Sequence, residues 1–395
     1  MKSLWNDADA AQCNSPLALR AYSSRLLGSD PSLVLHGGGN TSLKIDEHGT
    51  RVLYVKGTGN DLAHVDEHAF TPLRLDGVAK LLAQDSLNNS EMMHALDACI
   101  VRGPAPPPSI ETLLHAGLPF RCVEHTHADA VLAAMNVENI EAVHAEVYGE
   151  LAPLVPYHHS GHALARACVD VFRTRASQRS MGLVLAFHGV VAFADDARSA
   201  YENMIELVTR AERYLQSRGA WDLVSPTRVT TKIDTASLAR IHTEINAVAG
   251  VPLAMHINNN APCVAFAQRT DLAEIAQQGP ATPQHAVYTK RVPMLGRNVR
   301  AYAVTYRDYL DTHLGRAASA LIDAAPRIVL DAQAGVIAFG ATPRHAQIAA
   351  EMYEHDIAVI TRVSAHGRYR SAPAHAMAQA EFEYGGFAAR LHRVT

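Results

Sequence analysis

Three histidines follow two apolar segments of this 395-residue chain at positions where they can bind one metal ion. His125 and His127 end the sequence CVEHTH, in which we expect residues 121–125 to form a strand. Side chains two residues apart on a strand point to the same side, so both imidazoles can reach a single ion. His188 directly follows a second predicted strand, residues 182–187. An H-x-H pair alone is often incidental, but three histidines with an open fourth position are typical of a catalytic zinc site.

A carboxylate precedes these histidines in the sequence PSIET, residues 108–112. Glu111 stands at a predicted junction between a loop and a helix, where two interpretations remain open. In the first, it is an ordinary helix N-terminal glutamate that interacts favourably with the helix dipole. In the second, it points into the cleft at the strand ends and carries protons beside the metal.

Two glycine-rich segments also follow predicted strands, GGGNTS at residues 37–42 and KGTGN at residues 56–60. Glycine lets the backbone approach an anion closely and direct N–H groups at it, and Lys56 can add a positive charge for a phosphate. Neither segment matches a P-loop or a dinucleotide fingerprint, which argues against a nucleoside triphosphate or NAD. Each segment alone is also compatible with a plain tight turn.

The composition is that of a chain with a sizeable buried core, with 48% hydrophobic and 19% charged residues. A net charge of −4 without a basic stripe argues against nucleic acid as a partner. No apolar run approaches the ~20 residues that span a bilayer, so no membrane association is expected. The polar N-terminus does not resemble a signal peptide, and the five cysteines form no C-x-x-C pair. We therefore expect a cytoplasmic protein with reduced thiols.

Short strands alternate with helices along the chain, which predicts an α/β layer sandwich. Helices are predicted at 15–28, 75–84, 90–101, 128–135, 161–175 and 196–217, with a strand at 33–35, a hairpin of 43–45 and 52–55, and a strand at 190–194. The polar segment 222–235 indicates a boundary, so we predict domains at 1–224 and 225–395. The second, smaller α/β unit has predicted helices at 235–249, 299–318 and 343–362, and predicted strands near 252–257, 262–267, 327–331 and 335–339.

The second unit contains one conspicuous segment, GPATPQH at residues 279–285, followed by Tyr288, Lys290 and Arg291. It can fold over the active site and contribute Lys290 as a cation, or it can be a proline-stiffened loop between domains. The aromatic sequence FEYGGF at residues 382–387 can form a subunit or domain contact. The role of residues 225–395 is otherwise not assigned.

In their order and spacing, the sequences GGGNTS, KGTGND, SIETLLH, EHTHADAV and AFHGVVAFADDARSAYE resemble the class II aldolase/adducin family. This resemblance covers roughly residues 1–220. The whole chain is similar to the aldolase half of bacterial rhamnulose-1-phosphate aldolase/alcohol dehydrogenase fusions, whose dehydrogenase half would begin past residue 395. The resemblance implies a three-layer α/β/α sandwich, a homo-oligomer (commonly a tetramer) and a small sugar phosphate or related carbonyl compound as substrate.

The resemblance also implies roles for individual residues. Glu111 would be the catalytic acid and base, and Zn²⁺ or another divalent metal would be bound by His125, His127 and His188. The phosphate of a ketose 1-phosphate would be bound by Asn40, Thr58, Gly59 and Ser109, with Lys56 nearby. Ile110 stands where many members have a second serine. The tyrosine that some members supply from a neighbouring subunit has only two candidates, Tyr148 and Tyr157, and each is also compatible with ordinary packing. Extra histidines crowd one segment, namely His158, His159 and His162.

These features predict a zinc-dependent aldolase that cleaves a ketose 1-phosphate into dihydroxyacetone phosphate and an aldehyde through a metal-stabilised enediolate. The same site would also suit a decarboxylase of a 3-oxo acid phosphate or an epimerase of ketose phosphates. An alternative of another class is a non-catalytic, adducin-like assembly module. Adducin-type members lose metal ligands, whereas this chain retains all three histidines and Glu111, which favours an enzyme.

Overall fold

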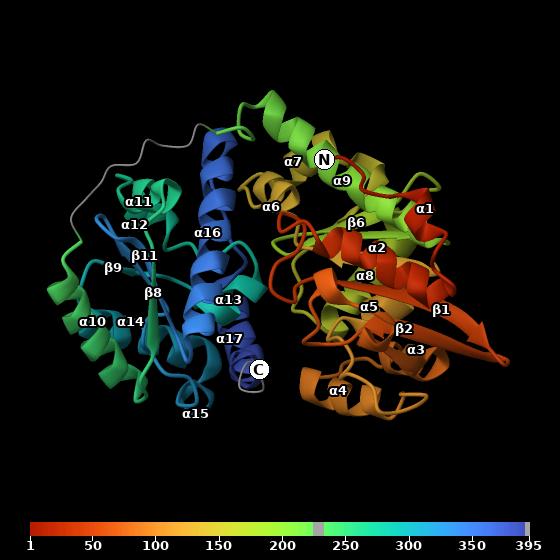
Figure 1. The fold of residues 1–395 in the computed structure, drawn as a ribbon, viewed down its shortest axis with the longest axis horizontal. Helices are drawn as coiled ribbons and strands as arrows, with labels where there is room; N and C mark the ends of the chain where they lie inside the picture. Colours follow the sequence, from red (N-terminus) through yellow and green to blue (C-terminus); the bar gives the residue numbers. More distant parts are fainter. Residues whose placement is uncertain (224–232, 392–395) are drawn as a thin grey trace. The chain divides into compact units, whose positions relative to one another are not determined.

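The computed structural model describes residues 1–223 and 233–391, which belong to two compact units (Figure 1). The first unit comprises residues 1–135 and 139–217, and the second comprises residues 136–138 and the chain from Arg218 onward. Residues 136–138 therefore belong to the second unit, although the residues that follow them, 139–217, belong to the first unit. The domain boundary predicted between residues 224 and 225 lies outside the described residues.

The first unit is built on a seven-stranded sheet with the order β3-β2-β1-β4-β7-β6-β5. Its strands are β1 (Asn40–Glu47), β2 (Thr50–Lys56), β3 (Phe70–Arg74), β4 (Cys122–Thr126), β5 (Leu154–Val155), β6 (Gly182–Leu185) and β7 (Gly189–Ala194). All neighbouring strands are antiparallel except β5 and β6, which are parallel. The central position of β4 gives it hydrogen-bonded neighbours on both sides, β1 and β7.

Helices cover both faces of this sheet. They are α1 (Asp7–Ala10), α2 (Pro16–Gly28), α3 (Leu75–Leu82), α4 (Asn89–Asp97), α5 (Thr112–Gly117), α6 (Asp129–Met135), α7 (Ile140–Val147), α8 (His162–Arg175) and α9 (Ala197–Ser217), with short 3₁₀ turns at Leu62–His64, Glu67–Ala69 and Gly149–Leu151. Helices α2, α6, α7 and α9 pack together on one face, and α3, α5 and α8 on the other. This arrangement confirms the predicted three-layer α/β/α sandwich.

The alternation of side chains along β2 shows how the sequence builds both faces. Val52 and Tyr54 join the apolar cluster beneath α2, whereas Leu53 and Val55 join the cluster beneath α3, α5 and α8. The predicted hairpin between β1 and β2 is confirmed. Its two turn residues, His48 and Gly49, both have positive φ, as a tight two-residue hairpin turn requires.

The strand predicted at residues 33–35 is wrong, because this segment forms turns. The amide of Leu33 donates to the carbonyl of Asp30, which closes a turn instead of joining the sheet. Leu33 and Val34 are nevertheless buried. A run of three apolar residues indicates burial, but it is too short to distinguish a strand from a packed turn.

The second unit is a smaller α/β structure, as predicted, with a four-stranded sheet in the order β8-β11-β10-β9. Its strands are β8 (Ala254–Asn258), β9 (Met294–Leu295), β10 (Ile328–Asp331) and β11 (Gly335–Gly340). Its helices are α10 (Thr235–Ala249), α11 (Ala261–Ala267), α12 (Leu272–Ile275), α13 (Pro283–Thr289), α14 (Val299–Leu314), α15 (Arg316–Ser319), α16 (Pro343–His366) and α17 (Ala374–Leu391). Among the helices in the described part of the chain, none is both long and apolar enough to cross a bilayer.

Two segments of the second unit are helices where the sequence interpretation had none. The strand predicted near 262–267 is helix α11, because the Asn260 side chain accepts from the amide of Cys263 and Pro262 stands in the first turn. The loop interpretation of the segment 279–285 is wrong from Pro283 onward, where α13 begins; Thr282 caps this helix by accepting from the amide of His285, and Pro283 stands in the first turn. In both cases the proline begins a helix.

A buried ion pair lies inside the first unit. The guanidinium of Arg20, on α2, donates to the carboxylate of Glu124, on β4, and both side chains are fully buried. Removing two charges from water costs several kcal/mol per ion, which their mutual attraction offsets only while both are present. The pair therefore links α2 to the strand that carries His125.

Removing one partner of this pair should destabilise the first unit strongly. We expect Glu124→Gln to lower its free energy of unfolding by about 3–5 kcal/mol, because the Arg20 charge stays buried without its counter-ion. Trp5 packs on Tyr22 and Tyr201 and can report this unit by its fluorescence in urea once Trp221 is replaced by Phe.

The control for this measurement is Glu150→Gln. Glu150 pairs with Arg179 on the surface, where an ion pair contributes about 0–1 kcal/mol. Equal effects of the two substitutions would show that the buried pair does not contribute in this way.

Candidate active site

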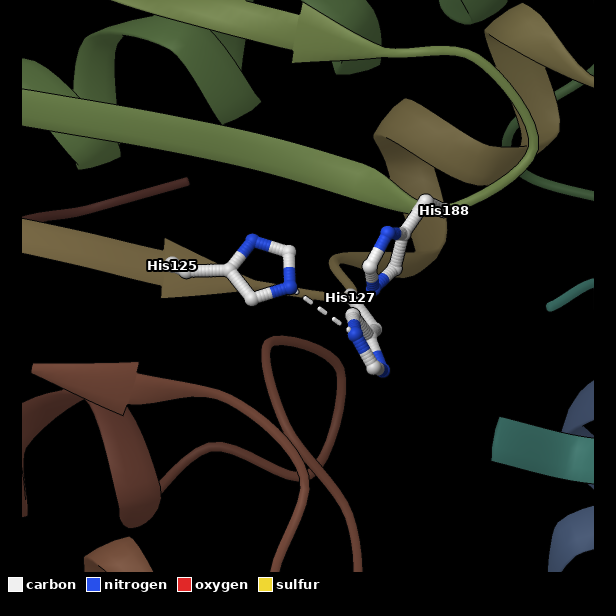
Figure 2. A group of neighbouring side chains, drawn as sticks. All are labelled: His125, His127 and His188. Carbon is white, nitrogen blue, oxygen red and sulfur yellow. Dashed lines mark hydrogen bonds between the residues drawn. The ribbon is translucent and has the colours of Figure 1, made fainter. Parts of the chain in front are cut away.

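Three histidine side chains from two neighbouring strands of the first unit converge (Figure 2). His125 lies on β4, His127 follows its end, and His188 lies in the turn between β6 and β7. One nitrogen from each ring lies within 4.8 Å of the others, and the Nε2 atoms of His125 and His127 are 3.0 Å apart. The rings of His125 and His188 are buried.

The pairing of the strands explains the position and orientation of His125. In the ladders it stands opposite Asn40 of β1 and Val191 of β7. Its Nδ1 lies 3.1 Å from the carbonyl of Val190, which can accept a hydrogen bond from it. With the proton on Nδ1, the lone pair of Nε2 faces the other two histidines, which is the form that binds a metal.

The turn between β6 and β7 has an unusual backbone that orients His188. Phe187 has φ +56° and Gly189 has φ +156°, so the residues on both sides of His188 have positive φ. A Cβ at position 189 would lie 2.2 Å from the carbonyl oxygen of Thr126 and 3.2 Å from Cδ2 of His127. Only glycine therefore lets this turn approach the end of β4 closely.

The carboxylate of Glu111 lies against this histidine cluster. Its Oε1 is 3.3 Å from Nε2 of His188, its Oε2 is 3.6 Å from Nε2 of His125, and its side chain is almost fully buried. Glu111 precedes the first residue of α5, and its side chain makes no capping hydrogen bond to that helix. Its carboxylate is therefore directed at the histidines, as the second sequence interpretation proposed.

Burial and charge act in opposite directions on these groups. Burial alone would raise the pKa of the Glu111 carboxyl, but His125 and His188, together with a hydrogen bond from Asn40, hold this pKa well below its usual range. Burial lowers the pKa of the His188 imidazole to about 4. At neutral pH the site thus contains a carboxylate and an uncharged His188, the states in which both can donate an electron pair.

These donors fit a divalent metal ion. Nitrogen ligands at ~2.0–2.1 Å from a tetrahedral ion lie roughly 3.4 Å apart. The distance between the Nε2 atoms of His125 and His127, 3.0 Å, and those from Glu111 to His188 and His125, 3.3 and 3.6 Å, are close to this value, and one nitrogen of each of the three rings lies within 4.8 Å of the others. Three imidazoles with one carboxylate are a donor set that suits zinc and related ions.

The residues expected to bind phosphate belong to three loops beside Glu111. The Lys56 ammonium is buried and donates to the carbonyl of Asn60 at 2.6 Å and to that of Gly37 at 3.4 Å. Burial lowers its pKa to about 8. Lys56 therefore joins the two glycine-rich segments, and its nitrogen is occupied by their carbonyls.

The remaining phosphate candidates also contact the proline-rich loop that precedes Glu111. The amide of Thr58 donates to the carbonyl of Pro107 at 2.8 Å, and its hydroxyl donates to that of Pro108 at 3.0 Å. The Oγ of Ser109 accepts from the amide of Glu111 at 3.2 Å. Gly59 has φ +88° in the turn next to Thr58. The structure thus brings Asn40, Lys56, Thr58, Gly59 and Ser109 to the loops around Glu111.

The tyrosine candidates and Lys290 have the following local surroundings. Tyr148 follows α7, where its ring is buried 6.0 Å from that of His144, and Tyr157 is half-buried after β5. Lys290 belongs to the second unit, where its ammonium donates to the backbone carbonyl of Asp323 and lies 4.9 Å from the centre of the Tyr306 ring.

One polar residue of this region, His115, was missed from the sequence, and His159 was noted there without a role. His115 is fully buried on α5 and hydrogen-bonded to Asn40 and Ser42. The signal was its position four residues after Glu111, on the same face of a helix. His159 is close enough to His188 to lower the pKa of that imidazole.

The histidine cluster should bind one divalent metal ion per chain. We expect replacement of His125, His127 or His188 by Ala to lower zinc affinity by more than the ~10–100-fold typical of residues that merely support a ligand. Competition titration of the metal-free chain with a chromophoric chelator measures this. His94→Ala, on the exposed face of α4, is the control, and equal affinity of all variants would exclude the site.

The close approach of the β6–β7 turn to β4 gives a second expectation. Gly189→Ala should lower metal affinity at least about tenfold, because the turn that carries His188 must move away from Thr126. Gly149→Ala is the matched control, since Gly149 also has positive φ but no atom within 4 Å of an added Cβ. A loss of the same size in both variants would assign the effect to backbone strain alone.

Comparison with known proteins matches each of the two units to a model of a known domain family. The family model "Class II Aldolase and Adducin N-terminal domain" matches residues 19–215, and the model "Aldolase class II, second domain" matches residues 232–386. A curated relative, "Uncharacterized oxidoreductase YuxG" of Bacillus subtilis, is 28% identical over 400 residues and is matched by 94% of this chain. The chain spans only 58% of the length of that relative.

Two solved structures that the chain resembles differ in how similar they are, and the first supports this assignment. The N-terminal class II aldolase domain of a conserved protein from Thermoplasma acidophilum is 35% identical, with a TM-score of 0.50 over 54% of this chain and 99% of that one. An L-fuculose-1-phosphate aldolase from Thermus thermophilus is 17% identical over 51% of this chain and 96% of that one, with a TM-score of 0.35. The two domain matches in tandem and the first of these structures show that the chain belongs to the class II aldolase/adducin family, whose aldolases are metal-dependent.

Proposed function

We propose that this chain is a zinc-dependent aldolase that cleaves a ketose 1-phosphate, or a similar sugar phosphate, into dihydroxyacetone phosphate and an aldehyde. The observation that carries the proposal is the convergence of three imidazole nitrogens on one another, with the Glu111 carboxylate 3.3 Å from His188 and 3.6 Å from His125. An adducin-like assembly module would need no such donor set.

His125, His127 and His188 would hold the ion. A divalent cation bound there supplies Lewis-acid stabilisation of the negative charge that develops on the substrate oxygens. The backbone contributes by keeping these rings in place before substrate arrives, through the Val190 carbonyl at His125 and the strained turn at His188.

Glu111 would move the proton. When the bond between the third and fourth carbons of the ketose breaks, its electron pair remains on the dihydroxyacetone side as an enediolate, and the fourth carbon leaves as an aldehyde. Ionised Glu111 would accept the proton that the hydroxyl of the fourth carbon loses as the aldehyde forms, and would then deliver it to the enediolate carbon; in the synthetic direction it removes the proton from that carbon. A lowered pKa keeps Glu111 ionised and ready to accept a proton at neutral pH.

The loops beside Glu111 would bind the phosphate. The hydroxyl of Ser109 and the backbone N–H of Gly59 are the donors we assign to it, on loops joined by Lys56. The Thr58 hydroxyl donates to the carbonyl of Pro108 and would have to turn from it to bind the phosphate. Ile110 packs against the apolar core and offers no hydroxyl there. No Schiff-base lysine takes part, and the ammonium of Lys56 is occupied by two carbonyls.

Other features of the proposal follow from the family. We propose a homo-oligomer, for which the tetramer of many class II aldolases is the model, acting in carbohydrate metabolism in the cytoplasm.

The longer curated relative has the name of an oxidoreductase. We propose that the present chain corresponds to the aldolase part of such a longer protein.

The zinc-loaded chain should release dihydroxyacetone phosphate from at least one ketose 1-phosphate in a coupled assay. Chelation should abolish this activity, added zinc should restore it, and Glu111→Gln should lower kcat by ~10²–10⁴-fold while zinc binding persists. Glu150→Gln, on the surface, is the matched control.

Parallel assays distinguish the alternatives. Release of CO₂ from 3-oxo acid phosphates, or interconversion of ketose phosphates without net cleavage, would replace the aldolase by a decarboxylase or an epimerase. Trapping of the substrate on a lysine by borohydride would refute the metal-dependent scheme altogether.

A further inference from the structure

A fully buried chain of polar groups connects the Glu111 carboxylate to the interior of the first unit. The amide nitrogen of Asn40 donates to Oε2 of Glu111 at 2.6 Å. The other end of that amide, Oδ1, is in contact with Nε2 of His115. On the far side of the ring, Nδ1 lies 2.8 Å from Oγ of Ser42. Each group in this chain has a neighbour at both ends.

The direction of each hydrogen bond follows from the carboxylate. Ionised Glu111 can only accept, so the NH₂ group of Asn40 must face it and Oδ1 must face His115. An accepting Oδ1 requires the proton of His115 on Nε2, which leaves Nδ1 to accept from the Ser42 hydroxyl. A neutral ring with this single tautomer satisfies all three contacts. Burial, as the largest cause, lowers the pKa of His115 to about 3, in agreement with a neutral ring.

We propose that His115 is a positioning residue for the proposed aldol reaction, which acts through the Asn40 amide to hold the Glu111 carboxylate in place. If the amide of Asn40 rotated by half a turn, its oxygen would face the carboxylate and repel it. Neutral His115 prevents this rotation, because only Oδ1 can accept from its Nε2–H. The inference rests on the proposed function.

The elements that carry these groups make the arrangement rigid. Asn40 and Ser42 lie two residues apart on β1 and so point to the same face, toward α5. Glu111 and His115 lie four residues apart at the start of α5, also on one face. Strand and helix are thereby connected twice, once through each nitrogen of the His115 ring.

This role differs from the one that family resemblance implies for Asn40. Its amide nitrogen is 2.6 Å from Glu111 but 3.4 Å from Oγ of Ser109, and its oxygen is occupied by His115. Both ends of the amide are therefore used to hold the catalytic carboxylate. The second N–H of the NH₂ group, on the side of Ser109, is the donor that remains for the predicted phosphate contact.

Substitutions of His115 can separate positioning from folding. His115→Gln places an amide nitrogen close to the position of Nε2 and keeps a donor to Asn40, whereas His115→Leu keeps the bulk and loses the donor. His144→Leu is the matched control, because His144 is a half-buried histidine of the same unit that hydrogen-bonds only to the carbonyl of Ala152.

The probe for these variants is dihydroxyacetone phosphate in D₂O with zinc-loaded protein. Exchange of its carbon-bound proton, followed by NMR, reports proton transfer without an aldehyde partner. We expect His115→Leu to lower the exchange rate at saturation by at least about tenfold with KM and zinc content unchanged, and His115→Gln to restore most of it. Exchange by His115→Leu at the rate of the unmodified chain and of His144→Leu would overturn the inference, as would a loss of zinc or a rise in KM that accounts for the whole effect.

A second readout needs no activity. In the metal-free chain at pH 7, ¹⁵N chemical shifts should show His115 neutral with its proton on Nε2. A proton on Nδ1, or an imidazolium, would overturn the inference. Absence of exchange in the unmodified chain would instead contradict the proposed function, so the two failures are distinguishable.

Discussion

The hydrogen-bond register of β4 between β1 and β7 is the constraint on which the site depends. Because β4 is central, its backbone donors and acceptors are used on both sides, and His125 is placed opposite Asn40 on one side and Val191 on the other. A shift of one residue would turn His125 and His127 to the face of α2 and α9 and bring Glu124 to the face of the site. Chemistry at this site thus requires one particular pairing.

The side chains on the two faces of β4 therefore make different kinds of contact. On one face Glu124 forms a fully buried ion pair with Arg20, and Thr126 donates to the sulfur of Met204 on α9. On the other face His125 is held by the Val190 carbonyl and lies near Glu111. A buried ion pair is weak support for stability, but it penalises any register that separates its partners. The ion pair on one face of β4 therefore supports the register that positions the candidate metal ligands on the other face.

The buried environment of the Glu111 carboxylate differs strongly from that of a carboxylate on the protein surface. It is buried, yet its oxygens face two imidazoles and one amide, so that charge and hydrogen bonding outweigh the loss of water. Each of these neighbours is itself oriented by a further partner: His125 by Val190, His188 by its turn, and Asn40 by His115. Preorganisation of this kind is what a site needs if it is to stabilise charge as soon as substrate binds.

Much of the first unit was predictable from local pattern. Apolar segments located β2 and β4, a serine followed by proline located the start of α2, and the spacing of two residues predicted that His125 and His127 share a face. Short apolar runs were ambiguous, which is why residues 33–35 and 262–267 were assigned as strands although they form turns and a helix. In the second unit, Pro262, predicted in a strand, and Pro283, assigned to a loop in one interpretation, stand in the first turns of α11 and α13. Sequence by itself thus predicted the sandwich and pointed to His125, His127, His188 and Glu111 as candidate site residues, through residue type, the segments that they follow and the family resemblance. Only the tertiary structure decided that Asn40 and His115 hold the carboxylate and that Lys290 lies against Asp323, since these contacts join residues that are 33 to 75 positions apart and depend on how strands and helices pack.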